Sequence, residues 1–249
     1  MELSKNEIKR VKSLSVKKFR DEAGLFAVEG EKLVAEALAS SFDVVDVYRT
    51  EEIGLEAMSR ISALSSPSPA LAVVRMKKGL RLDDAASAGI VRENGLYLGL
   101  DVIRDPGNLG TIIRISEWFG VKSVLAAHGT VDLYNPKVLQ ATMGAVFRVD
   151  FHYVNLLEAA SSIRSLGGKV YGTFLNGDNI YSRELSNGAD SPVMVVTGNE
   201  SEGISDALGR IVTDRLHIPP FPPDDPGSES LNAAVATAVT LAEFRRRLS

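Results

Sequence analysis

The chain has 249 residues, of which 45% are hydrophobic and 24% charged. These proportions are ordinary for a soluble globular protein with one large domain or two smaller ones. The sequence holds no cysteine, which excludes disulfide bridges and thiolate metal sites. Its three histidines, at positions 128, 152 and 217, lack the spacing of a metal motif, so we expect no bound metal.

No apolar run approaches the roughly 20 residues that span a bilayer, so we expect no membrane segment. The N-terminus, MELSKNEIKR, is polar and unlike a signal peptide, which favours a cytoplasmic location. The net charge of −4 argues against strong non-specific binding to nucleic acid. Basic residues nevertheless concentrate in residues 1–20 and at 245–247. They form either a solvated helix face with a solubilising tail or a local RNA-facing patch, and both interpretations stay open.

The first 76 residues predict a small α/β domain. A capping-box pattern at residues 4–7, followed by apolar residues at helical spacing, predicts a helix to about residue 20. We expect strands over residues 26–30, 44–48 and 70–76, and helices over 31–40 and 55–64. The charged, glycine-containing stretch 77–94 is expected to be a linker, or alternatively a surface excursion of a single domain.

Residues 95–249 predict a second α/β domain. Longer apolar runs predict strands over 96–102, 123–127, 169–175, 192–198 and 215–219. Helical patterns lie between them, over 108–119, 155–166 and 231–247. Near-continuous apolar strands that alternate with helices predict a mostly parallel sheet that is covered on both faces.

Three unusual segments follow predicted strands, and ligands in open α/β sheets bind at the carboxyl ends of strands. The first is DPGNLGTIIR at residues 105–114, in which we expect Asn108 to cap a helix. A helix start offers free N–H groups to an anion, and Arg114 is placed to grip a phosphate with two hydrogen bonds. The alternative is a capped helix whose arginine pairs with a surface carboxylate.

The second segment is GNESEG at residues 198–203, where two glycines let the backbone approach a ligand closely. The third joins Ile218-Pro219 to SLNAAVA at residues 230–236, the expected start of the last helix. Taken singly, the second segment is a weak signal that an ordinary strand-to-helix loop also explains, and a close-packed C-terminal helix is the better explanation of the third. The usual nucleotide-binding and nucleophile-elbow signatures are absent from the sequence.

Together, and in this order, the three segments resemble the motifs of the SpoU/TrmH class of SPOUT RNA methyltransferases. The stretch NPKVLQATMGA at 135–145 resembles the family's segment between its first two motifs, and FAVEGEKL at 26–33 resembles the substrate-binding domain often fused to these enzymes. The resemblance implies methylation of a ribose 2′-hydroxyl in structured RNA with S-adenosylmethionine as donor. Ribosomal and transfer RNA both fit, and the separate N-terminal domain favours ribosomal RNA. It also implies a homodimer and a parallel-sheet catalytic domain with a C-terminal deep trefoil knot over 95–249, preceded by a small α/β substrate-binding domain over 1–76.

The resemblance also implies a set of site residues. Arg114 would act in catalysis, as a base or as a phosphate clamp, and the clamp is the milder role because arginine holds its proton firmly. The residues that would position Arg114, the ribose and the partner subunit's loop are Asn108, Glu200, Ser230 and Asn232. The residues that would bind the cofactor are Thr173, Leu175, Gly198, Asn199, Glu200, Gly203, Ile218, Pro219, Leu231 and Asn232.

One stretch departs from the family pattern. The link over residues 220–229 is rich in proline and aspartate and longer than usual, and we expect it to reshape or gate the cofactor pocket beside which it begins. Two other functions compete with this interpretation. A non-catalytic RNA-binding protein on the same fold would not need to keep all five catalytic residues, and a Rossmann-type dehydrogenase would carry the dinucleotide fingerprint that is missing.

Overall fold

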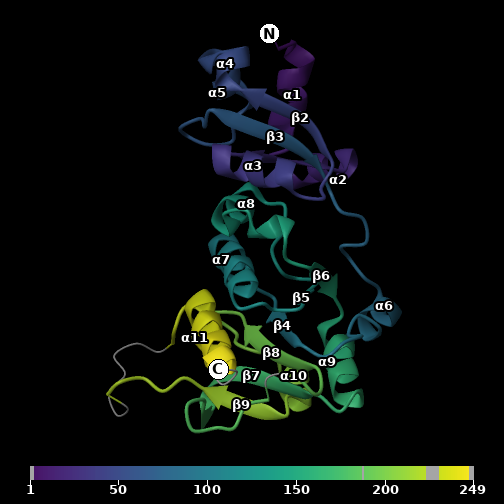
Figure 1. Cartoon of the computed structure of the whole chain (residues 1–249), viewed down its shortest axis with the longest axis vertical. Coiled ribbons are helices and arrows are strands. Elements are labelled where there is room, and N and C mark those ends of the chain that lie inside the picture. The colour runs from purple at the N-terminus through teal and green to yellow at the C-terminus, as the bar shows by residue number, and fades with distance from the viewer. Residues whose placement is uncertain (1–2, 187, 223–229, 247–249) are drawn as a thin grey trace. The chain divides into compact units, whose positions relative to one another are not determined.

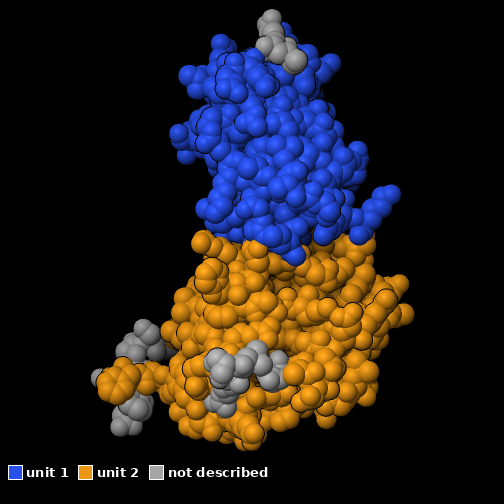
Figure 2. All heavy atoms as spheres, viewed as in Figure 1, with its two compact units in different colours: residues 1–78, 132–148 blue, residues 79–131, 149–249 orange. Residues whose placement is uncertain are grey.

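The computed structural model describes residues 3–186, 188–222 and 230–246 of the chain (Figure 1). Its contacts divide the chain into two compact units, which Figure 2 shows in different colours. Unit 1 contains residues 1–78 and 132–148, and unit 2 contains residues 79–131 and 149–249. The chain therefore crosses between the units three times, whereas the sequence suggested a single crossing in a linker over 77–94.

Unit 1 is built on an antiparallel sheet in the order β1 (Leu25–Glu29), β3 (Ala70–Arg75), β2 (Val44–Arg49). Helices α1 (Lys5–Ser13) and α5 (Leu55–Ile61) share a hydrophobic cluster with β3. The other helices of the N-terminal part are α2 (Lys17–Ala23), α3 (Glu31–Ala39) and α4 (Thr50–Ile53). The strands and helices expected over residues 26–76 are confirmed, with boundaries that move by three residues or fewer.

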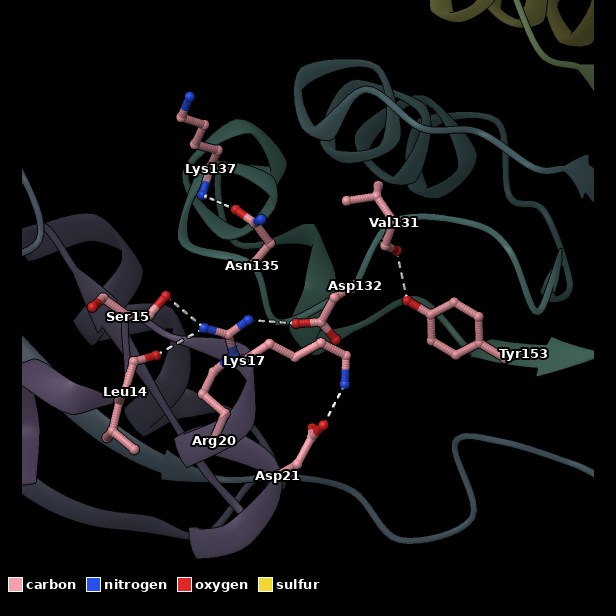
Figure 3. Close-up of polar contacts among 10 residues, drawn as sticks. All are labelled: Leu14, Ser15, Lys17, Arg20, Asp21, Val131, Asp132, Asn135, Lys137 and Tyr153. Atoms are coloured by element: carbon pink, nitrogen blue, oxygen red, sulfur yellow. Dashed lines mark hydrogen bonds and ion pairs between the residues drawn. The ribbon is translucent and has the colours of Figure 1, made fainter.

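The first helix is interrupted, and Arg20 provides the physical reason. Instead of one helix to about residue 20, α1 ends at Ser13 and α2 begins at Lys17. The buried Arg20 guanidinium donates hydrogen bonds of 2.9 Å to the carbonyl oxygens of Leu14 and Ser15, which the break leaves without helical partners (Figure 3). The same guanidinium pairs with Asp132 at 2.6 Å, so the break in the helix serves a tertiary contact.

Residues 132–148 belong to unit 1 because they complete its core. They form α8 (Pro136–Thr142) and a short 3-10 helix (Ala145–Phe147). Tyr134 stacks on Phe26 with ring centroids 4.3 Å apart, and Phe147 meets Phe42 edge-on at 5.1 Å. The sequence placed this stretch in the second domain, since nothing local indicates that its aromatic side chains pack on residues more than a hundred positions earlier.

Unit 2 is a six-stranded sheet in which every neighbouring pair of strands is parallel. The parallel sheet expected from the sequence is therefore confirmed, although its edge strand β6 was not predicted. The strand order is β6 (Phe151–Val154), β5 (Val124–Ala127), β4 (Leu96–Asp101), β8 (Val193–Gly198), β7 (Lys169–Asn179), β9 (Asp214–His217).

Helices cover both faces of this sheet. On one face, α9 (Leu156–Ser165) and α10 (Asp206–Ile211) pack on a cluster that includes Val170 and Val196. On the other, α7 (Pro106–Trp118) lies against α11 (Ala233–Arg246) (Figure 1). The ring centroids of Phe244 in α11 and Tyr171 in β7 are 5.0 Å apart. No helix within the described residues is long and apolar enough to cross a membrane.

The stretch expected to be a linker is an ordered part of unit 2. The backbone of Tyr153 in β6 pairs with Leu80 at 2.8 Å and with Leu82 at 2.9 Å. Helix α6 (Asp84–Ala88) follows and packs on α9. Residues 80–82 thus pair with the outer edge of β6. Without them this edge strand would present unpaired backbone groups to solvent.

Candidate active site

The three motif segments meet at the carboxyl edge of the parallel sheet. Strands β4 and β8 are neighbours and end in register, with Asp101 opposite Gly198. The first segment follows β4 and the second follows β8. The pair Ile218-Pro219 follows β9, and the remainder of the third segment opens α11. This edge is where a parallel sheet binds its ligands, so the placement supports a common site.

The start of α7 differs from the expectation in one respect. Asn108 was predicted to cap this helix, but the cap is Asp105, whose Oδ1 accepts a hydrogen bond of 2.8 Å from the Asn108 backbone N–H. Pro106 occupies the first turn, where its missing N–H costs nothing. Because the Asp105 carboxylate accepts a free backbone N–H of the first helical turn, the Asn108 side chain is not needed as a cap and can make contacts across the site.

Those contacts join all three motifs through side chains. Asn232 donates from Nδ2 to Asn108 Oδ1 at 2.9 Å, and Asn108 in turn donates from Nδ2 to Glu200. Asn232 Oδ1 accepts from the backbone N–H groups of Ala234 at 3.0 Å and Val235 at 3.3 Å, so this residue also caps α11. The Asn232–Asn108–Glu200 network therefore fixes the starts of two helices to the loop after β8.

The loop at residues 198–203 is closed on itself. The backbones of Asn199 and Gly203 exchange hydrogen bonds of 3.0 and 2.9 Å. A Cβ atom on Gly198 would lie 2.2 Å from the carbonyl carbon of Gly203, so no side chain fits there. Gly203 has φ +69°, a conformation that side chains disfavour. Both glycines are therefore required for this loop shape.

Arg114 lies apart from the network. It follows Asn108 by six residues, which places it about 9 Å farther along α7 and roughly 120° around it. It belongs to a solvent-facing stripe at helical spacing, made of Gly107, Thr111, Arg114 and Trp118. Within the described residues Arg114 has no hydrogen-bonded or ion-paired partner, so the alternative in which it pairs with a surface carboxylate finds no support among them.

The predicted cofactor residues lie at the ends of neighbouring strands. Thr173 is partly buried in β7, where its hydroxyl donates to the Val196 carbonyl oxygen at 3.3 Å. Ile218 and Pro219 are half-buried after β9. Leu175 is 68% and Leu231 49% exposed, so both offer apolar surface to a ligand.

Two expectations near the cofactor residues find no contact in the structure. Ser230 is exposed and makes no hydrogen bond with any described residue. Of the proline- and aspartate-rich link over 220–229, residues 223–229 lie outside the described residues, and so does the expected effect of this link on the pocket.

Several residues that shape the site were missed in the sequence. Asp101 at the end of β4 is buried and accepts from the Ser205 backbone N–H at 2.7 Å. Arg104 pairs with Glu202 through two bonds of 3.0 and 3.2 Å. The available signal was a carboxylate that ends an otherwise apolar strand, since buried charge requires a partner.

The basic residues at the chain ends are mostly engaged within the protein. Arg245 donates to the carbonyl oxygens of Phe119 and Gly120 at 2.6 Å, and burial lowers its pKa from the ordinary value. Arg246 makes two bonds of 2.8 Å with Glu243. Together with the buried Arg20, these contacts give these three arginines a structural role, while Arg247 lies outside the described residues.

The comparisons with known proteins agree with this geometry. Residues 95–242 match the model of the SpoU rRNA Methylase family, and residues 5–75 match that of the MRM3-like substrate binding domain. The chain is 31% identical to the 23S rRNA (guanosine(2553)-2′-O)-methyltransferase RlmP of Bacillus subtilis, over 98% of each chain.

Two solved structures are similar over nearly their whole length. An AdoMet-bound rRNA methyltransferase from Sinorhizobium meliloti is 28% identical with a TM-score of 0.84, over 100% of this chain and 98% of that one. A protein from Porphyromonas gingivalis, assigned to the TrmH family of RNA methyltransferases, is 35% identical with a TM-score of 0.83, over 98% and 99%. The chain therefore belongs to the SpoU rRNA methylase family, the class of RNA ribose 2′-O-methyltransferases that its motifs resemble.

Proposed function

We propose that this chain transfers the methyl group of S-adenosylmethionine to a ribose 2′-hydroxyl of ribosomal RNA. The Asn232–Asn108–Glu200 network carries the proposal, because it assembles all three motifs at the ligand-binding edge of the sheet. The relatives support ribose as the reacting group. One is named for a guanosine and another, from Streptomyces viridochromogenes, for a uridine, and both names specify the 2′-O position.

The predicted cofactor residues fit S-adenosylmethionine in their chemistry. Ligand pockets combine apolar walls with a few placed polar groups. Here Ile218 and Leu231 offer the apolar walls, and the loop from Gly198 to Gly203 offers a tight backbone turn at the end of β8. The bound cofactor supplies an electrophilic methyl group on a cationic sulfur. The proposal needs no metal.

The chain's own task is to align the ribose and remove its proton. Alignment of two reactants supplies roughly 7–11 kcal/mol of the barrier. Asn108, Glu200 and Asn232 hold the ribose side of the site in place through their mutual bonds. Arg114, which has no hydrogen-bonded or ion-paired partner among the described residues, binds the phosphate next to the reacting ribose. The proton leaves through that phosphate, because arginine holds its own proton too firmly to act as a base.

A homodimer places Arg114 at the reaction. Trp118 is 84% exposed on α7, and Leu231 and Val235 are about half exposed at the start of α11, the helix that packs against α7. Exposed apolar side chains gathered on neighbouring helices are typical of a protein–protein interface. In a two-fold dimer through this surface, the Arg114 stripe of one subunit faces the partner's site.

The trefoil knot and the cytoplasmic location stand as part of this proposal. Strand β9 lies beyond β7 at the sheet edge, and the chain then returns so that α11 packs on α7 and β8. This return of the chain from the edge strand β9 to the middle of the sheet supports a knot in which the C-terminal segment is threaded through an earlier loop. Ribosomal RNA as substrate is compatible with an enzyme of the cytoplasm.

The test is methyl transfer from labelled S-adenosylmethionine to ribosomal RNA taken from cells that lack the gene. We expect Arg114→Ala to abolish transfer while S-adenosylmethionine binding stays nearly intact. Arg164→Ala is the matched control, because Arg164 is another exposed helical arginine of unit 2. Equal loss of transfer and binding in Arg114→Ala would contradict its role, and absence of transfer by the unaltered protein despite cofactor binding would favour the non-catalytic RNA-binding protein.

A further inference from the structure

The connection between β4 and α7 touches the loop after β8 at several points, although none of its residues is assigned a catalytic or cofactor-binding role above. It begins at Asp101, the last residue of β4, and ends at Asp105, the cap of α7. The loop after β8 runs from Gly198 to Ser205, the residue before α10. Because β4 and β8 end in register, the two segments leave the sheet side by side.

The first contact fixes the far end of the loop. Asp101 is 6% exposed, and its Oδ2 accepts the Ser205 backbone N–H at 2.7 Å. A hydrogen bond to an ionised acceptor is about twice as strong as one between neutral groups. Removal of a buried acceptor also leaves the amide unsatisfied. Asp101 therefore holds the point at which the loop turns into α10.

The second contact fixes the near end. Asn199 is buried and donates from Nδ2 to the Val102 carbonyl oxygen at 2.9 Å, while its Oδ1 accepts from the backbone N–H and the hydroxyl of Ser201. Val102 has φ +59°, which is rare for a β-branched residue and costs conformational energy. Val102 holds this strained conformation while its carbonyl oxygen accepts the hydrogen bond from the Asn199 side chain.

The third contact is at the surface. Arg104 and Glu202 form a two-bond pair with both side chains more than half exposed. Exposed pairs contribute little to stability, so this pair orders the loop tip without carrying its shape. The Asp101–Ser205 bond, whose acceptor is buried, is the stronger restraint. Glu200 lies between the two fixed ends and accepts a hydrogen bond from Asn108.

We infer that Asp101 is a positioning residue for the methyl-transfer site, which holds the loop from Gly198 to Ser205 in the shape that binds S-adenosylmethionine. The inference rests on the proposed function for the identity of the ligand. Asp101 acts through the loop backbone and touches neither the cofactor nor the RNA. Its effect should therefore fall on cofactor affinity and leave RNA binding unchanged.

The experiment compares Asp101→Ala, Asp101→Asn and the control Asp83→Ala in the full-length protein. Asp83 caps α6 and accepts the Ala86 N–H at 2.8 Å, a bond of the same kind away from the site. We expect Asp101→Ala to raise the S-adenosylmethionine Kd by about tenfold or more, equal to about 1.4 kcal/mol. Asp101→Asn should recover most of the affinity because its amide oxygen still accepts from Ser205, and Asp83→Ala should bind like the unaltered protein.

Hydrogen exchange separates loop positioning from general instability. In Asp101→Ala, exchange should accelerate at the Ser205 amide and in residues 198–205, with the rest of unit 2 still protected. An Asp101→Ala protein that binds S-adenosylmethionine within about twofold of the unaltered protein would overturn the inference, as would uniform loss of protection. If the unaltered protein binds no S-adenosylmethionine, the proposed function fails, while the exchange measurement still decides whether Asp101 holds the loop.

Discussion

The buried ion pair between Arg20 and Asp132 allows a quantitative test of how unit 1 is assembled. The two side chains are 3% and 14% exposed and 2.6 Å apart, and Arg20 also serves the carbonyl oxygens of Leu14 and Ser15 (Figure 3). Replacement of Arg20 by methionine keeps the aliphatic bulk but leaves a largely buried carboxylate and two carbonyl groups without this donor. Removal of one partner of a buried pair costs about 3–5 kcal/mol.

Urea denaturation followed by circular dichroism measures this cost. We expect Arg20→Met to lower the free energy of unfolding of unit 1 by about 3–5 kcal/mol, and the double variant Arg20→Met/Asp132→Leu to lose less than the sum of the single losses. Arg10→Met is the matched control. Its pair with Asp46 is 40% and 32% exposed, so its loss should be at most about 1 kcal/mol. Equal losses for Arg20→Met and Arg10→Met would refute the reasoning.

Two further predictions concern the site and the dimer. Gly198→Ala should abolish S-adenosylmethionine binding in calorimetry, because the added Cβ would lie 2.2 Å from the Gly203 backbone. Gly209→Ala is its control and should bind normally, because its Cβ would come no closer than 4.0 Å to the Phe174 ring. Normal binding by both variants would contradict the closed loop. Trp118→Glu should convert a dimer to a monomer in light scattering and lower transfer, because a charge replaces the most exposed apolar side chain of the α7 stripe. Leu166→Glu is its control, since Leu166 is 51% exposed at the end of α9, on the other face of the sheet. A Trp118→Glu protein that stays dimeric would exclude this interface.

The sequence predicted unit 2 well because its signals are local. Continuous apolar runs such as LYLGLD at 96–101 and VMVVTG at 193–198 became buried parallel strands. The motif segments follow those strands, and parallel strands end at a common edge, so the meeting of Asn108, Glu200 and Asn232 follows from order and spacing. Short β6, with only four residues, gave no comparable signal.

The helix cap of α7 and the buried Arg20 pair could not be predicted, because in each case several residues compete for the same hydrogen-bonding or ion-pairing role. Both Asp105 and Asn108 are good capping residues, and only the structure shows that the aspartate takes the cap while the asparagine turns to the network. Arg20 looks like one more charge in a basic run, yet it is buried against Asp132. Such long-range pairs leave no periodic trace in the sequence.

The placement of residues 132–148 in unit 1 also depends on long-range contacts that the sequence pattern does not reveal. The family models assign residues 5–75 and 95–242 to separate domains, whereas Tyr134 and Phe147 complete the core around Phe26 and Phe42. The substrate-binding unit thus borrows part of its core from within the methyltransferase sequence. Aromatic packing between distant segments decided this division, and composition alone does not reveal it.

The most direct test of the central claim is the chemical identity of the methylated nucleoside. Ribosomal RNA from cells lacking the gene is incubated with the protein and S-adenosylmethionine, digested, and examined by mass spectrometry together with an alkaline cleavage ladder. The account predicts one nucleoside that carries its new methyl group on the ribose and one gap in the ladder, since a blocked 2′-oxygen cannot attack the adjacent phosphate. A methyl group on a base, with an unbroken ladder, would contradict it.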